Sequence, residues 1–137
     1  MYKKILDKYG IDSEIIKLNL VDKKIFKPYE KLGESIYIYD GLNKKEYTNV
    51  IYGKKYFDQV VTKLKHFNFI FSSDLNLENK DMPEIYKKCF IGLRLTERDG
   101  NANTVQEFEA MKIPIIHNGS DYGLKWDSTE DIINHIY

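Results

Sequence analysis

From residue 35 onward, the hydrophobic positions of the chain fall into two alternating patterns. Short, nearly continuous apolar runs indicate buried strands, and they lie at residues 35–39, 67–71, 90–95 and 113–116. Between and after these runs, apolar residues recur at helical spacing, in residues 54–65, 83–89, 103–111 and 129–136. In the first of these segments, Phe57, Val60 and Leu64 lie on one face of the predicted helix.

Strands that alternate with helices of this length indicate parallel β-α-β units with right-handed crossovers. The sequence therefore predicts an α/β fold, a single Rossmann-like domain with a mainly parallel sheet, and 137 residues fit one domain. We treat residues 1–32 as an N-terminal extension of this domain, because their pattern is weaker. In it we expect a helix at 2–9 and a strand at 14–20. Residues 26–29 should be extended, since Pro28 disfavours a helical residue before it.

In an open parallel sheet, ligands bind outside the carboxyl ends of the strands. Four loops lie there in the predicted topology, at residues 40–42, 72–74, 96–103 and 117–123. The third loop leads into a helix for which Asn103 fits the N-cap, with Gln106 three residues later as in a capping box. The unpaired N–H groups of that helix and its dipole predict an anion site suited to a diphosphate.

Two acids accompany this helix start. Glu107 lies about one turn into the helix, where a carboxylate can accept hydrogen bonds from both hydroxyls of a ribose diol. Asp99 is placed to accept from the hydroxyls of a second sugar, and Gly100 lets the backbone approach a ligand closely. The candidate ligand-binding residues are Asp99, Gly100, Asn101, Asn103, Thr104, Val105 and Glu107.

Seven residues separate Asp99 from Glu107, and Pro114 of the next apolar run follows seven positions after Glu107. Over about residues 35–125, this arrangement resembles the E-x7-E donor-binding region of family 4 glycosyltransferases with the GT-B fold. In three places the sequence departs from the family pattern. Asp99 occupies the position where the family has a Glu, and Lys112 the position where it has a Gly. The segment after the first strand lacks the Arg that the family often has there.

The resemblance implies the C-terminal, donor-binding half of an enzyme that transfers a sugar from a nucleotide diphosphate sugar, with retention favoured over inversion. It leaves the base, the sugar and the acceptor open. It implies catalysis without a metal or other cofactor, and Asp99 is the one candidate catalytic residue. It adds Gly41, Lys45 and His117 to the donor site. An acceptor domain, N-terminal or on a partner chain, would be needed, and without it this chain would be inactive.

Composition narrows the remaining classes of function. Lys and Arg together equal Asp and Glu, at 21 each, whereas proteins that bind a phosphate backbone are usually basic, so we expect no nucleic acid partner. No apolar stretch is long enough to span a membrane. The single cysteine, Cys89, excludes an internal disulfide and fits a cytoplasmic location. The three histidines and Cys89 lack the spacing of zinc ligands, so we expect no metal site.

Other interpretations of the same residues stay open. A non-catalytic nucleotide- or protein-binding module would share the fold, and so would a receiver-like signalling domain with Asp40 as its phosphate acceptor. Arg94, on a strand that should be buried, needs a carboxylate partner, and Glu107 or Glu109 is suited to that role. His117 is equally well explained as a turn residue after the last strand.

Overall fold

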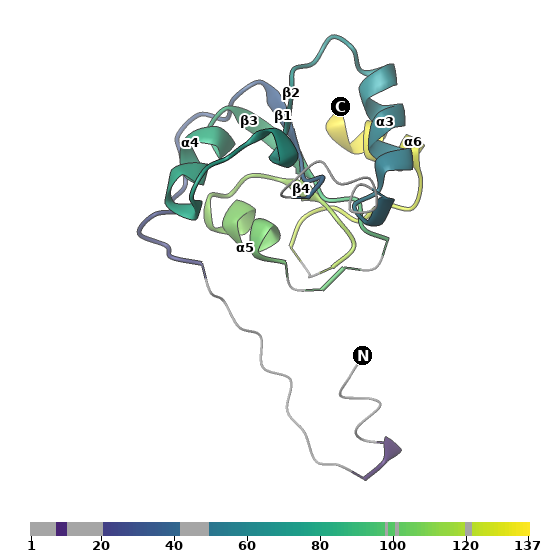
Figure 1. Cartoon of the computed structure of the whole chain (residues 1–137), viewed down its shortest axis with the longest axis horizontal. Helices are drawn as coiled ribbons and strands as arrows, with labels where there is room; N and C mark the ends of the chain where they lie inside the picture. Colours follow the sequence, from purple (N-terminus) through teal and green to yellow (C-terminus); the bar gives the residue numbers. More distant parts are fainter. Residues whose placement is uncertain (1–7, 11–20, 42–49, 98, 101, 120–121) are drawn as a thin grey trace.

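The computed structural model describes residues 8–10, 21–41, 50–97, 99–100, 102–119 and 122–137. One sheet is formed by β1 (Ser35–Ile38), β2 (Phe69–Phe71), β3 (Cys89–Leu93) and β4 (Ile115–Ile116). Its order is β2-β1-β3-β4, and every pair of neighbours is parallel. The predicted α/β class with a parallel sheet is confirmed (Figure 1).

Helices cover both faces of this sheet. They are α3 (Lys54–Lys63), α4 (Met82–Tyr86), α5 (Asn103–Ala110) and α6 (Thr129–Ile136). Successive strand residues point to opposite faces. Accordingly, Ile36 and Ile38 pack in one buried cluster with residues of α3 and α6, whereas Tyr37 packs in a second cluster with residues of α4 and α5. Figure 1 shows these two helix pairs on opposite sides of the strands.

The eight elements predicted from residue 35 onward are present in the predicted order, with shorter strands and helices at several ends. The helix expected at 83–89 is α4, which ends at Tyr86, and the last strand has only two residues. Two short 3-10 helices, Ser72–Asp74 and Asn79–Asp81, were not predicted. The strand expected at 14–20 and nearly all of the helix expected at 2–9 lie outside the described residues. None of the described helices has the length and apolarity needed to cross a membrane.

Helix α5 ends in a Schellman motif centred on Lys112. The N–H of Ile113 donates to the carbonyl of Phe108 at 2.9 Å, and the N–H of Lys112 donates to the carbonyl of Glu109 at 3.0 Å. This geometry requires Lys112 to adopt a φ of 57°, in the left-handed region that favours glycine. The motif ends the helix and leads the chain into β4.

We predict that Lys112→Gly raises the free energy of unfolding by about 0.5–1 kcal/mol. Glycine removes left-handed strain of about 1–2 kcal/mol. Part of this gain is lost because glycine has a higher conformational entropy in the unfolded chain. Urea unfolding monitored by circular dichroism measures the change. The matched control is Lys63→Gly in the last turn of α3, which should lower the free energy of unfolding by about 1 kcal/mol. Equal losses for both variants would contradict the prediction.

Candidate functional site

The carboxyl ends of β1 and β2 are tied together by a buried aspartate. Asp40, 6% exposed, accepts hydrogen bonds from the backbone N–H of Ser73 at 2.8 Å and from its hydroxyl at 2.7 Å. The Ser72 hydroxyl lies 3.0 Å from the same carboxylate and accepts from the N–H of Asp40. Both carboxylate oxygens are therefore engaged within the protein. An aspartate that accepts a phosphoryl group needs an accessible oxygen, so the structure gives the receiver-like alternative no support.

Beyond β3, Arg94 forms an ion pair with Asp99 in its own loop. The Nε of Arg94 lies 2.6 Å from a carboxylate oxygen of Asp99, and both side chains are largely buried, at 13% and 7% exposure. The guanidinium also lies over the rings of Tyr39, at 4.5 Å, and Tyr52, at 5.2 Å. The expectation that Glu107 or Glu109 would pair with Arg94 is wrong. Arg94 follows the last residue of β3, so its side chain reaches the loop ahead of it.

The start of α5 differs from the prediction by one residue. Ala102, with an extended φ and ψ of −69° and 140°, is the N-cap, and Asn103 is the first helical residue. No side chain caps this helix among the described residues, so the expected capping box with Gln106 is absent. Asn103 is exposed, while Thr104 and Val105 are buried. A role of these three residues toward a diphosphate stays a prediction.

Glu107 is a buried carboxylate with a phenol partner. It is 6% exposed and accepts a hydrogen bond from the Tyr86 hydroxyl at 2.8 Å. Burial raises the pKa of Glu107 above its usual value, and the hydrogen bond from Tyr86 opposes that shift. Tyr86 in turn packs against Tyr37 and Phe108. The predicted contact of Glu107 with a ribose is not tested by this arrangement, but a ribose would have to share the carboxylate with Tyr86.

His117 holds the loop after β4 in place. It is fully buried, its Nδ1 accepts from the N–H of Gly119 at 3.1 Å, and its Nε2 bonds to the carbonyl of Tyr122. The ring is therefore neutral with its proton on Nε2, and burial lowers its pKa. These contacts match the interpretation of His117 as a turn residue, while its predicted contact with a ligand stays untested.

The remaining candidates fall into two groups. Gly41 is buried with a φ of 103°, which suits a glycine at the end of β1. Gly100 is exposed, and a Cβ added there would meet nothing within 4 Å. Asn101 and Lys45 lie outside the described residues. Asp99, Gly100 and His117 come from loops that meet at one edge of the sheet, as the topology predicted.

A cavity lies beside a different helix, α3. Its volume is about 720 Å³, and it opens between the N-terminus of α3 and the residues that follow β3. Its lining includes Val50, Ile51, Gly53, Tyr56, Leu95 and Thr96. None of the predicted site residues that the structure describes is among its lining residues. The sequence pattern did not predict this cavity, although it contains a glycine before a helix start, Gly53, and a threonine after a buried strand, Thr96.

Gly53 gives the cavity its shape. It is the N-cap of α3, with a left-handed φ of 80°, and no side chain among the described residues caps the helix. A Cβ at this position would lie 2.7 Å from the Cβ of Leu95 and closer still to its carbonyl oxygen. Gly53 therefore allows the N-terminus of α3 to approach the end of β3. The Thr96 hydroxyl oxygen is buried at this junction without a hydrogen-bond partner among the described residues.

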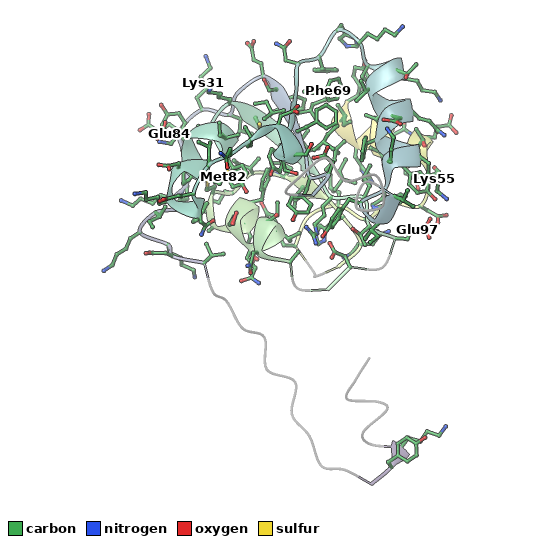
Figure 2. All side chains as sticks on the ribbon, viewed as in Figure 1. Lys31, Lys55, Phe69, Met82, Glu84 and Glu97 are labelled. Atoms are coloured by element: carbon green, nitrogen blue, oxygen red, sulfur yellow. The ribbon has the colours of Figure 1, made fainter. Side chains whose placement is uncertain are left out.

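Charges of both signs surround the cavity. Lys54 pairs with Asp58 at 2.8 Å, and Lys55 lies 3.4 Å from Glu97. Figure 2 shows Lys55 and Glu97 side by side at the α3 corner of the molecule. Glu97 also accepts a hydrogen bond from the Tyr56 hydroxyl at 2.9 Å. These pairs are exposed, so solvent screens them and each contributes little to stability.

Other chemistry is limited in the part of the chain that the structure describes. It contains no group of three or more His, Cys, Asp or Glu side chains arranged to hold a metal ion. Cys89 is buried in β3, and burial raises the pKa of its thiol to about 12. A thiol with so high a pKa is protonated at neutral pH and is a poor nucleophile.

The chain is similar in sequence to a protein named as a nuclease. A ribonuclease Z from Borrelia garinii subsp. bavariensis is 32% identical to this chain over 108 residues, which are 79% of this chain and 30% of the relative. The chain thus spans less than a third of the length of that relative. No family model matches the chain, and no solved structure matches it.

These comparisons correct the interpretation of the sequence. The relative bears the name of a nuclease, and the absence of a matching family model leaves the glycosyltransferase resemblance without support. The assignment to a GT-B glycosyltransferase, and with it the activity of sugar transfer, is therefore wrong. The physical reason lies in the short motif on which it rested. Asp99 and Glu107 both have partners inside the protein, Arg94 and Tyr86, that account for acids at this spacing.

Proposed function

We propose that this chain is a nucleotide-binding module whose ligand occupies the cavity between the N-terminus of α3 and the end of β3. The observation that carries the proposal is the position of this cavity. The strand order is β2-β1-β3-β4, so β2, which follows β1 in the sequence, pairs with one edge of β1, and β3 pairs with the opposite edge. The boundary between β1 and β3 is the switch point where open parallel sheets bind ligands, at the carboxyl ends of the strands.

The polar groups of the cavity favour a phosphate. The first N–H groups of a helix have no acceptor within the helix, and the helix dipole adds positive charge there. In α3, the backbone N–H groups of Tyr56 and Phe57 donate to the carbonyl of Gly53. The backbone N–H groups of Lys54 and Lys55 come before these first intrahelical hydrogen bonds. Their exposed ammonium groups can exchange a carboxylate partner for a phosphate. The cavity volume of 720 Å³ lies within the usual range of small-molecule sites, ~300–1,000 Å³.

Ligand-induced thermal stabilisation tests the proposal. We expect UDP, GDP or ADP at millimolar concentration to raise the Tm, because a ligand at ten times its Kd adds about 1.4 kcal/mol to the free energy of unfolding. Thr96→Val keeps the shape of the side chain but removes the hydroxyl, and it should weaken the shift. Lys63→Gln, at the far end of α3, is the control and should keep it. Failure of all three nucleotides to raise the Tm would contradict the proposal and favour a protein-binding module.

The same assay separates the cavity from the residues predicted around α5. Glu107→Gln removes the charge of the predicted ribose contact without touching the cavity lining. If the nucleotide lies in the cavity, Glu107→Gln should retain the ligand-induced shift that Thr96→Val loses. The reverse pattern would place the ligand beside α5. A second domain or partner chain beside the site, and the cytoplasmic location, stay predictions.

A second candidate function is RNA binding, which the relative named ribonuclease Z favours. The balanced charge of this chain, with 21 basic and 21 acidic residues, works against it. Fluorescence anisotropy with a labelled RNA at 50 and 200 mM salt distinguishes the two functions. Binding that weakens steeply with salt would support an RNA partner, because phosphate contacts release counterions.

A further inference from the structure

Two large apolar side chains of the proposed nucleotide cavity are exposed to solvent. Val50 is 70% exposed and Ile51 is 56% exposed, and both line the cavity. Gly53, the N-cap of α3, follows them in the chain and lines the same cavity. Contiguous apolar side chains that are left exposed beside polar groups are typical of a ligand-binding surface. Val50 and Ile51, here called the apolar pair, therefore lie within reach of a ligand whose phosphate is bound at α3.

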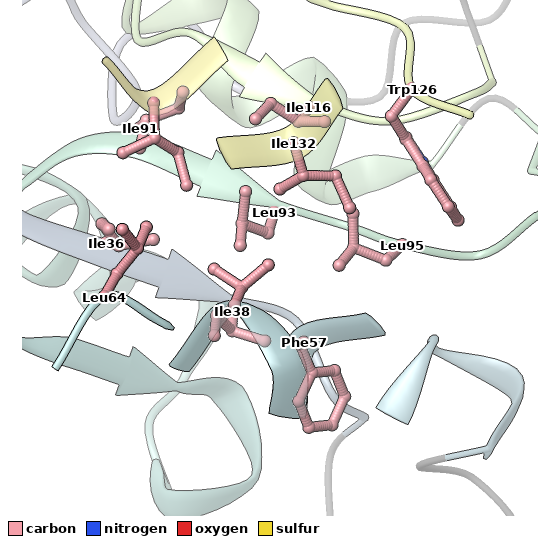
Figure 3. Close-up of a cluster of buried hydrophobic side chains, with 12 residues drawn as sticks. Ile36, Ile38, Phe57, Leu64, Ile91, Leu93, Leu95, Ile116, Trp126 and Ile132 are labelled. Carbon is pink, nitrogen blue, oxygen red and sulfur yellow. The ribbon is translucent and has the colours of Figure 1, made fainter. Parts of the chain in front are cut away.

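The aromatic ring of the cavity already has neighbours on it. Tyr56 and Trp126 form a T-shaped pair with ring centroids 4.6 Å apart, and the Lys55 ammonium lies 4.7 Å from the centroid of Tyr56. A base that stacked on Tyr56 would compete with these neighbours. Leu95 also lines the cavity, but it is 1% exposed and belongs to the buried cluster of Figure 3. Exposed apolar contact in the cavity is therefore offered by the apolar pair.

The charged side chains of the cavity have partners within the protein. Lys54 lies 2.8 Å from Asp58, and Lys55 lies 3.4 Å from Glu97. Glu97 also accepts a hydrogen bond from the Tyr56 hydroxyl. All four charged side chains are exposed, so a hydrogen bond from one of them to a base replaces a hydrogen bond to water and has a small net effect. These groups are therefore poorly suited to distinguish one base edge from another.

We infer that the site holds a purine nucleotide through contact between its base and the apolar pair, without distinguishing adenine from guanine. This inference rests on the proposed function and names the ligand class of the same site. A purine has two fused rings and covers more apolar surface than a pyrimidine. Because the free energy of burial grows with the apolar area removed from water, purines should bind more tightly than pyrimidines.

Isothermal titration of the intact chain with ADP, GDP, IDP, UDP and inorganic pyrophosphate tests the inference. We expect ADP, GDP and IDP to bind with affinities within about threefold of one another, because their edges differ but their ring systems do not. Each should bind about fivefold more tightly than UDP, and more tightly still than pyrophosphate. The heat capacity change should be more negative for ADP than for pyrophosphate, since burial of apolar surface makes it negative.

A variant of the apolar pair links this preference to the protein. Ile51→Ser should lower the affinities for ADP and GDP alike, by about fivefold, and leave the affinity for pyrophosphate unchanged. Because Ile51 is exposed, the change removes no buried packing. Leu77→Ser is the matched control, since Leu77 is also exposed but is not among the lining residues of the cavity. It should leave all five affinities unchanged.

The outcomes separate this inference from the proposed function. A larger difference among ADP, GDP and IDP would show that the base edge is read, which overturns the inference and leaves the nucleotide site in place. Affinities for UDP or pyrophosphate equal to that for ADP would also overturn the inference. So would an Ile51→Ser variant that binds ADP as tightly as the wild type does. Absence of binding by all four nucleotides would overturn both proposals.

Discussion

Gly53→Ala is expected to lower the free energy of unfolding by about 3 kcal/mol. Two costs add at this position. An alanine at a φ of 80° brings left-handed strain of about 1–2 kcal/mol. Its Cβ would also lie 2.7 Å from the Cβ of Leu95, and overpacking of a buried site costs about 1–3 kcal/mol. Urea unfolding monitored by circular dichroism measures the loss.

Two other glycines separate these costs. Gly10 has a φ of 72° but nothing within 4 Å of an added Cβ, so Gly10→Ala reports the strain alone. Gly100 has neither a positive φ nor a close neighbour, so Gly100→Ala should change the stability by less than about 0.5 kcal/mol. If Gly53→Ala costs no more than Gly10→Ala, the close approach of α3 to the end of β3 does not constrain this position.

Tyr86→Phe is expected to lower the free energy of unfolding by about 2 kcal/mol at pH 8, with a smaller loss at pH 5. The variant keeps the aromatic packing but leaves the Glu107 carboxylate buried without the hydroxyl that donates to it at 2.8 Å. Removing the partner of a buried charged group costs about 1–3 kcal/mol or more. Urea unfolding at the two pH values measures both the loss and its pH dependence.

The direction of the pH effect follows from the pKa of Glu107. Burial already raises this pKa above 4.5, and loss of the Tyr86 hydrogen bond raises it further. A carboxyl with a raised pKa binds a proton more readily in the folded state, so stability increases as the pH falls through that pKa. The penalty in Tyr86→Phe is therefore fully present above the raised pKa and declines toward acid. The control is Glu107→Gln, in which Tyr86→Phe should lose this pH dependence. A loss that is equal at both pH values would argue against an ionised Glu107.

The fold was predictable because its signals are local. Phe57, Val60 and Leu64 recur at helical spacing, and all three are buried in one cluster with the strands. The alternation of helices with strands predicted parallel pairing, which all three strand pairs show. The order of the strands was not predicted, since hydrophobic spacing does not say on which side of β1 a later strand is added.

The site was less predictable because it depends on side-chain direction in loops. The partner of Arg94 is Asp99, five residues ahead, and nothing in the spacing of the acids distinguished it from Glu107. The partner of Glu107 is Tyr86, which comes from another helix. Of the three departures from the glycosyltransferase pattern, Lys112 is the one with a visible structural cost. Its φ of 57° lies in the left-handed region, which glycine adopts without steric strain.

The all-parallel sheet also has a consequence for how the chain reaches its native state. Ile36 pairs with Phe69 on one side and Ile91 on the other, while Gly92 pairs with Ile115. Each of these strand pairs therefore joins segments separated by an intervening crossover, so none of the pairs in the described sheet can form through a two-residue hairpin. Long loops must close before any of these strand pairs can form, and chains dominated by such distant pairings fold slowly for their size. Helix α3, which lies between β1 and β2, can reduce this entropic cost if it forms early.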